Sequence, residues 1–190
     1  MLFNSYIFIF LFLPLALIGY FVLNRLGRNM YAKVFLLVMS FWFYGYFNYT
    51  YLAVIISSIA VNYAVVYLMR RYPGRKKLCL AAGLVFDIGM LFYFKYFDFF
   101  LTNVNAVFNL SFTMRNIVLP LGISFFTFQQ ISYVVDAYHG ETDEESFLDY
   151  AVFVTFFPQL IAGPIVTHDE LIPQIKDENR QRPDYGNLSK

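Results

Sequence analysis

The feature that most constrains this chain is a series of apolar blocks, each close to the length of about twenty residues that spans a bilayer as a helix. The blocks cover residues 6–23, 31–47, 51–69, 78–97, 117–138 and 147–166. A water-soluble core does not need so many fully apolar helices in succession. We therefore expect an all-α fold, a polytopic integral membrane helical bundle that has the lipid bilayer as its surroundings.

Composition agrees with a membrane protein. Hydrophobic residues make up 59% of the chain and charged residues 14%, whereas soluble domains carry about 25% charged residues. The formal net charge is +1 and no basic stripe is present, so we expect no nucleic-acid partner. The single cysteine, Cys79, cannot form an internal disulfide.

Basic residues fall in alternate loops, which predicts the orientation in the membrane. They follow the first and third blocks, at Arg25, Arg28, Lys33, Arg70, Arg71, Arg75, Lys76 and Lys77. The loop at 45–50 carries none. Because basic loops stay on the cytoplasmic side, we expect the N-terminus to lie outside.

The second half of the chain has a less regular pattern. Residues 98–114 mix apolar and polar residues, which favours a helix lying in the outer interface rather than a span. Pro120, Pro158 and Gly163-Pro164 interrupt the last two blocks. Such interruptions are tolerated at membrane depth only inside protein or beside a cavity. We therefore expect broken or re-entrant helices in this half.

A polar stripe marks the block at 117–138. Gln129, Ser132 and Asp136 fall on one face at the helical period of 3.6 residues. One interpretation is the wall of a wet cavity or substrate path, to which Gln159 in the last block also contributes. The other interpretation is hydrogen bonding between helices that holds the bundle together.

Two polar residues lie inside otherwise apolar blocks, Asp87 in the fourth and Asn62 in the third. A charged Asp at the centre of a bilayer costs roughly 2.5–3.5 kcal/mol, so Asp87 must face inward, pair or take up a proton. Lys95 is not on the same helical face, and we expect another partner. Asp87 is either a site or relay residue or a structural hydrogen-bonding group; for Asn62 the structural interpretation is favoured.

The two histidines are expected to be solvated loop residues. His139 lies beside an acidic loop, and His168 follows Thr167 in a run typical of a capping box with Glu170. Pro173 is expected to keep that helical turn short. Because residues adjacent on a helix do not face one another and no second cluster of ligands is present, we expect no metal site.

Four strings resemble the membrane-bound O-acyltransferase family, in its bacterial branch for alginate and other polysaccharides. They are FKYFDFF at 94–100, PLGISFFTFQ at 120–129, FFPQLIAGPI at 156–165 and HDELIPQ at 168–174. The resemblance covers nearly the whole chain. It implies an O-acyltransferase in the bacterial plasma membrane.

The resemblance also implies a reaction and its partners. An acetyl group would pass from a cytoplasmic donor such as acetyl-CoA, a substrate rather than a bound cofactor, to hydroxyls of an extracytoplasmic polysaccharide such as alginate. The transfer would be direct or through an extracytoplasmic acetyltransferase partner. A histidine deep in the fold would act as the general base.

The match stops short of that histidine. Family members are more than twice this length, and neither His139 nor His168 is in a matching position. We therefore expect an N-terminal portion of such an enzyme, with no catalytic residue in this chain and no activity on its own. Teichoic acid or peptidoglycan is an alternative acceptor. A non-enzymatic transport or scaffold subunit is an alternative of another class.

Overall fold

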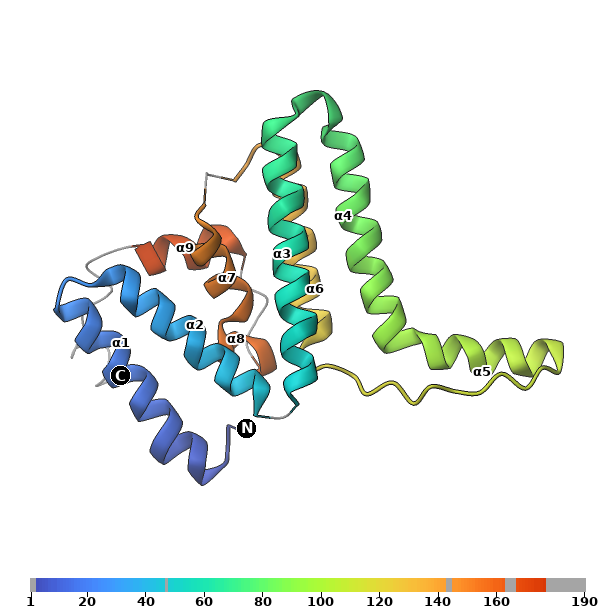
Figure 1. Cartoon of the computed structure of the whole chain (residues 1–190), viewed down its shortest axis with the longest axis horizontal. Helices are drawn as coiled ribbons and strands as arrows, with labels where there is room; N and C mark the ends of the chain where they lie inside the picture. The colour runs from blue at the N-terminus through green and yellow to red at the C-terminus, as the bar shows by residue number, and fades with distance from the viewer. Residues whose placement is uncertain (1–2, 47, 143–144, 163–166, 177–190) are drawn as a thin grey trace.

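The structure is a computed structural model that describes residues 3–46, 48–142, 145–162 and 167–176. Within these residues all regular structure is helical (Figure 1), which confirms the all-α prediction. The α-helices are α1 (Leu13–Arg25), α2 (Asn29–Gly45), α3 (Tyr49–Arg71), α4 (Lys76–Leu91), α5 (Phe97–Phe108), α6 (Ile123–His139), α7 (Phe147–Thr155), α8 (Phe157–Ala162) and α9 (His168–Lys176).

Three helical stretches among the described residues are long and apolar enough to cross a bilayer: Phe8–Arg25, Tyr49–Arg71 and Pro73–Phe108. The first includes a π-helical turn before α1. Helices α2 and α6 have 17 residues each, about 26 Å at 1.5 Å per residue. Large apolar side chains such as Phe10 and Val85 are 73% and 71% exposed. Such a surface suits lipid rather than water, as a membrane helical bundle requires.

The stretch Pro73–Phe108 bends sharply. A π-helical segment, Phe92–Tyr96, separates α4 from α5, and α5 leaves the α3–α4 hairpin at a large angle (Figure 1). Insertions of this kind are a recognised cause of kinks. The helix predicted from 98 is therefore present, but the prediction was wrong for residues 109–114, which are not helical. The position of α5 in the outer interface stays a prediction.

The segment after α5 returns along that helix without regular structure. Asn109 ends α5 in the left-handed conformation, with φ 49°. The Asp98 carboxylate accepts hydrogen bonds from the backbone N–H groups of Arg115 (3.1 Å) and Ile117 (3.0 Å). Helix α6 then begins at Ile123, later than the predicted 117, because Gly122 turns the chain with φ 68°.

The predicted span 147–166 is broken. Helix α7 ends at Thr155 and Phe156 has ψ 101°, after which α8 begins. Pro158 explains the break, because it has no N–H to donate to Val154 and its ring would clash with that carbonyl in a continuous helix. This confirms broken helices in the second half; Gly163-Pro164 lies outside the described residues. Helix α9 runs through Pro173, so the expectation that this proline keeps the turn short was wrong.

Two apolar regions form the core. The larger lies where α3, α6 and α7 meet and includes the fully buried Tyr133 and Tyr150. The second is an aromatic cluster in which the Phe12 ring lies 5.0 Å from Phe157 and 5.7 Å from Phe43, between centroids. The aromatic cluster packs α1 and α2 against α8. The larger region surrounds the polar residues described next.

Candidate functional site

Four polar side chains form a buried hydrogen-bonded group, the central network, between α3, α4 and α6. Asn62 Nδ2 donates to Asp87 Oδ1 at 2.8 Å and to Gln130 Oε1 at 2.6 Å. The Ser58 hydroxyl donates to the same Gln130 oxygen at 3.0 Å. All four side chains, Ser58, Asn62, Asp87 and Gln130, are fully buried. Asn62 therefore joins α3 to both α4 and α6.

A glycine allows α4 to approach its neighbours at this level. Gly83 lies one turn before Asp87, and a Cβ built on it would lie 3.2 Å from a Val65 methyl group and 3.4 Å from a Val134 methyl group. Both distances are tighter than ordinary van der Waals contact. The absence of a side chain at Gly83 thus brings the Asp87 carboxyl within hydrogen-bonding range of α3.

Asp87 has an amide partner and no cationic one. Among the described residues no ion pair includes Asp87, and its Oδ2 atom has no hydrogen-bond partner. The prediction that Lys95 is not the partner is confirmed, since Asn62 takes that place. The geometry supports the structural interpretation of Asn62 directly.

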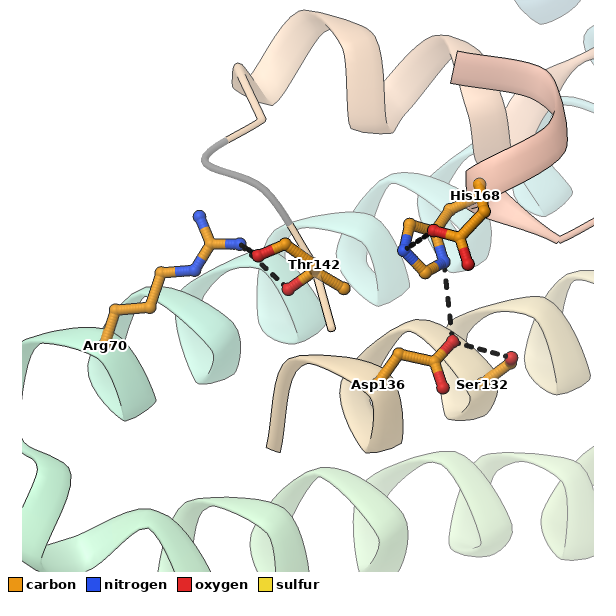
Figure 2. Close-up of polar contacts among 6 residues, drawn as sticks. Arg70, Ser132, Asp136, Thr142 and His168 are labelled. Atoms are coloured by element: carbon orange, nitrogen blue, oxygen red, sulfur yellow. Dashed lines mark hydrogen bonds and ion pairs between the residues drawn. The ribbon is translucent and has the colours of Figure 1, made fainter. Parts of the chain in front are cut away.

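A second polar group, the α6–α9 cluster, lies on another face of α6 (Figure 2). The Ser132 hydroxyl donates to Asp136 Oδ2 at 3.2 Å. His168 Nδ1 lies 3.4 Å from the same oxygen, and His168 Nε2 lies 2.6 Å from Asp169 Oδ1. The side chain of Asp136 is 25% exposed and that of Asp169 67%. This cluster therefore opens to the surface, unlike the central network.

His168 corrects the expectation that both histidines are solvated. Only His139, at the end of α6, is exposed; His168 is 3% exposed. Its ring meets the Tyr133 ring edge-on, 5.5 Å between centroids. Each ring nitrogen lies within 3.4 Å of a carboxylate oxygen, but neither makes a hydrogen bond of good geometry within the described residues. The arrangement places α9 beside α6, with a carboxylate near each nitrogen of the buried imidazole.

Two stacked tyrosines, Tyr133 on α6 and Tyr150 on α7, lie next to the α6–α9 cluster. The rings of Tyr133 and Tyr150 are 4.5 Å apart and 29° from parallel. Neither hydroxyl has a hydrogen-bond partner among the described residues. Polar side chains thus extend inward from His168 through an otherwise apolar interior.

The structure separates the predicted stripe residues into different surroundings. Ser132 and Asp136 lie together in the α6–α9 cluster, whereas Gln129, on the same face, is 3% exposed and its Oε1 has no hydrogen-bond partner in the described part of the chain. Gln159 is buried on α8, which packs mainly against α2. Gln159 therefore comes from a different part of the bundle from the stripe.

Sequence reasoning missed three participants. Gln130 lies 100° from Gln129 on the helical wheel and so fell outside the stripe, yet it is the residue that bonds to Asn62. Ser58 and Tyr150 had no signal beyond their polarity within apolar blocks. For Gln130 the sequence held the same signal as for Asn62, an amide side chain inside an otherwise apolar block.

No group of three or more His, Cys, Asp or Glu side chains that could hold a metal ion occurs in the described ranges. The site is accordingly one of hydroxyl, amide and carboxyl groups, with one buried imidazole. Such groups can bind a sugar or thioester by hydrogen bonds.

The comparison with known proteins gives the family. The chain is 40% identical to the peptidoglycan O-acetyltransferase of Helicobacter pylori, over 100% of this chain and 41% of that protein. It is 36% identical to the probable alginate O-acetylase AlgI of Pseudomonas putida, over 93% of this chain and 37% of that protein. The corresponding protein of Pseudomonas aeruginosa is 35% identical, with 92% and 34% covered.

The chain is homologous to the O-acetyltransferases of the membrane-bound O-acyltransferase family. The resemblance carried by the four strings is thereby confirmed. The chain spans between 34% and 41% of the length of these three relatives. No protein-family model matches the chain, and no solved structure gives a significant match.

Proposed function

We propose that the chain forms part of a bacterial plasma-membrane O-acyltransferase that transfers an acetyl group from a cytoplasmic donor to hydroxyls of an extracytoplasmic polysaccharide. The observation that carries the proposal is homology over 92–100% of the chain to proteins named as O-acetyltransferases. Peptidoglycan and alginate, the polymers in those names, both offer sugar hydroxyls as acceptors.

The reaction is an acyl transfer from sulfur to oxygen. The sugar hydroxyl oxygen forms a bond with the acyl carbonyl carbon, the bond between that carbon and the donor sulfur breaks, and the hydroxyl proton ends on the thiol. A thioester such as acetyl-CoA is the proposed donor, because it is made on the cytoplasmic side. An acetyltransferase partner outside the membrane would serve as a relay where the polymer cannot reach the bundle.

We assign the α6–α9 cluster and Gln129 to the wall of the acyl path. The positions of these residues support the assignment, because Ser132 and Asp136 lie partly exposed beside buried Gln129 on one helical face. Gln159 is proposed to shape the path from α8. The proton-abstracting base is proposed to come from elsewhere in the protein, because His168 faces two carboxylates and His139 is exposed. These 190 residues alone are then expected to transfer no acetyl groups.

Complementation tests the proposal. The complete coding sequence that contains this chain is expressed in a host that makes polysaccharide but has lost O-acetylation. Ester-linked acetate released from peptidoglycan and from alginate by mild base is then measured. Restored acetate on either polymer supports the proposal and identifies the acceptor. Protein present in the membrane with no acetate on either polymer would contradict it.

Expression of residues 1–190 alone tests the expectation that these residues transfer no acetyl groups. We expect no acetate above the background of the host, because no free imidazole lies in the polar interior described. Acetate at the level of the complete protein would show that the necessary base is among these residues. Membrane fractionation of both proteins provides the control for expression.

A further inference from the structure

The turn between α3 and α4 carries a dense group of cations. Arg75, Lys76 and Lys77 are consecutive, and Arg75 and Lys77 are exposed. They lie on the 3-10 turn Pro73–Arg75 and the first turn of α4. Arg70, in the last turn of α3, already donates hydrogen bonds to Thr142 (Figure 2). The hydrogen bonds of Arg70 account for its position, but no such contact accounts for the three consecutive cations in the described residues.

A hollow of about 550 Å³ lies at this turn. Its lining combines the three cations with the backbone of the turn and a phenol from the last turn of α6; the lining residues are Pro73, Gly74, Arg75, Lys76, Lys77, Leu78 and Tyr138. A Cβ at Gly74 would meet nothing within 4 Å. The space is therefore open, cationic and provided with hydroxyl and ammonium donors.

The local electrostatics are unfavourable without an anion. No carboxylate forms an ion pair with Arg75, Lys76 or Lys77 in the parts of the chain that the structure describes. The first turn of α4 contains no acidic residue. Cations are disfavoured at a helix N-terminus, whereas Arg70 and Arg71 lie at a helix C-terminus, where they are favoured. A bound anion would convert this repulsion at the start of α4 into attraction.

Aromatic side chains place the turn at the level of lipid headgroups. Tyr67 and Tyr72 flank it and are 61% and 55% exposed. Tyrosines are enriched at the membrane–water interface, and the long apolar stretches Tyr49–Arg71 and Pro73–Phe108 meet at this turn. Clusters of Lys and Arg next to a span on the cytoplasmic side bind anionic headgroups.

We propose that the α3–α4 turn is a phosphate-binding site, filled by the phosphodiester of an anionic membrane lipid. Arg75, Lys76 and Lys77 supply the charge, and Tyr138 lines the hollow from the last turn of α6. A soluble phosphorylated molecule has the same chemistry and is the competing source. The site does not depend on the proposed acyl transfer.

The test uses the complete protein in a neutral detergent, with native mass spectrometry as the readout. Phosphatidylglycerol, phosphatidylcholine and inorganic phosphate are titrated separately. Arg75→Gln/Lys77→Gln removes two exposed cations from the hollow. Arg25→Gln/Arg28→Gln is the matched control, because it removes two exposed cations from the α1–α2 turn.

We expect phosphatidylglycerol to bind in preference to phosphatidylcholine. Each cation removed from the hollow should weaken binding about fivefold, from the contribution of a single cation near a membrane surface, while the control changes it less than twofold. Equal loss in both variants, or no preference for the anionic lipid, would overturn the site. Binding of inorganic phosphate alone, lost in Arg75→Gln/Lys77→Gln, would overturn the lipid assignment.

Discussion

The central network and the α6–α9 cluster share helix α6 but differ in almost every physical respect. The side chains of the central network are fully buried, and neutral amide and hydroxyl donors join its three helices. The cluster is charged, partly exposed and joins α6 to the short helix α9. Polarity inside a membrane helix therefore does not by itself mark a functional site. The central network is sealed from the surface and the α6–α9 cluster is reached from it, and this difference in access separates the two groups.

The comparison predicts that stability depends on the network. Helices in lipid gain no hydrophobic free energy from associating, so packing and polar contacts hold them together. In the aromatic cluster the contacts are between rings; in the network they are hydrogen bonds. Substitutions in the central network should thus change the free energy of unfolding. Substitutions in the α6–α9 cluster should instead change acetyl transfer.

The largest effect is expected for Asn62→Leu. The substitution removes the donor to Asp87 and Gln130 and leaves both buried acceptors without it, which should cost about 2 kcal/mol of unfolding free energy. Thermal unfolding of the complete protein in detergent checks this. Val85→Leu, on the exposed face of α4, is the control and should leave the midpoint unchanged. An Asn62→Leu protein as stable as the control would show that the network does not hold the bundle.

A smaller effect is expected for Asp87→Asn. The amide keeps an oxygen that accepts from Asn62 and removes the ionisable group, so the free energy of unfolding should change by less than about 1 kcal/mol. Acetyl transfer should persist if Asp87 is structural. A stable Asp87→Asn protein without transfer would instead assign Asp87 to a proton relay. The same unfolding assay and the acetate assay provide both readouts.

The smallest effect on stability is expected for Ser132→Ala. The change removes one partly exposed hydrogen bond within α6, from Ser132 to Asp136, and should cost less than the average of about 0.6 kcal/mol for a hydrogen bond between membrane helices. Unfolding midpoints measured beside Ser58→Ala provide the comparison, since Ser58 makes its bond inside the network. A larger loss for Ser132→Ala than for Ser58→Ala would reverse the distinction between the two groups.

The sequence predicted the presence of the helices better than their bends and boundaries. Apolar length located α1, α3 and α4 because a span needs a fixed number of residues, and the prolines at 120 and 158 correctly indicated irregular backbone. The bend at Phe92–Tyr96 had no sequence signal, since a π-helical turn there depends on packing. The boundary at Ile123 was missed because an apolar run continues through Pro120 and Gly122.

The site was only partly predictable for a similar reason. Helical periodicity brought Ser132 and Asp136 to one face, and the structure shows them hydrogen-bonded. Periodicity within one helix carries no information on which other helix approaches. The partners from α3, α7 and α9, namely Ser58, Tyr150 and His168, could therefore not be deduced. His168 in particular looked like a solvated residue because its neighbours in sequence are charged.

The measurement that most directly tests the central claim is acetyl transfer by Asp136→Asn in the complete protein, at equal membrane abundance. The account predicts that transfer falls about tenfold or more, because small displacements of groups along a reaction path are costly, while the unfolding midpoint stays near that of the unaltered protein. Unchanged transfer with unchanged stability would contradict the claim that the α6–α9 cluster lines the acyl path.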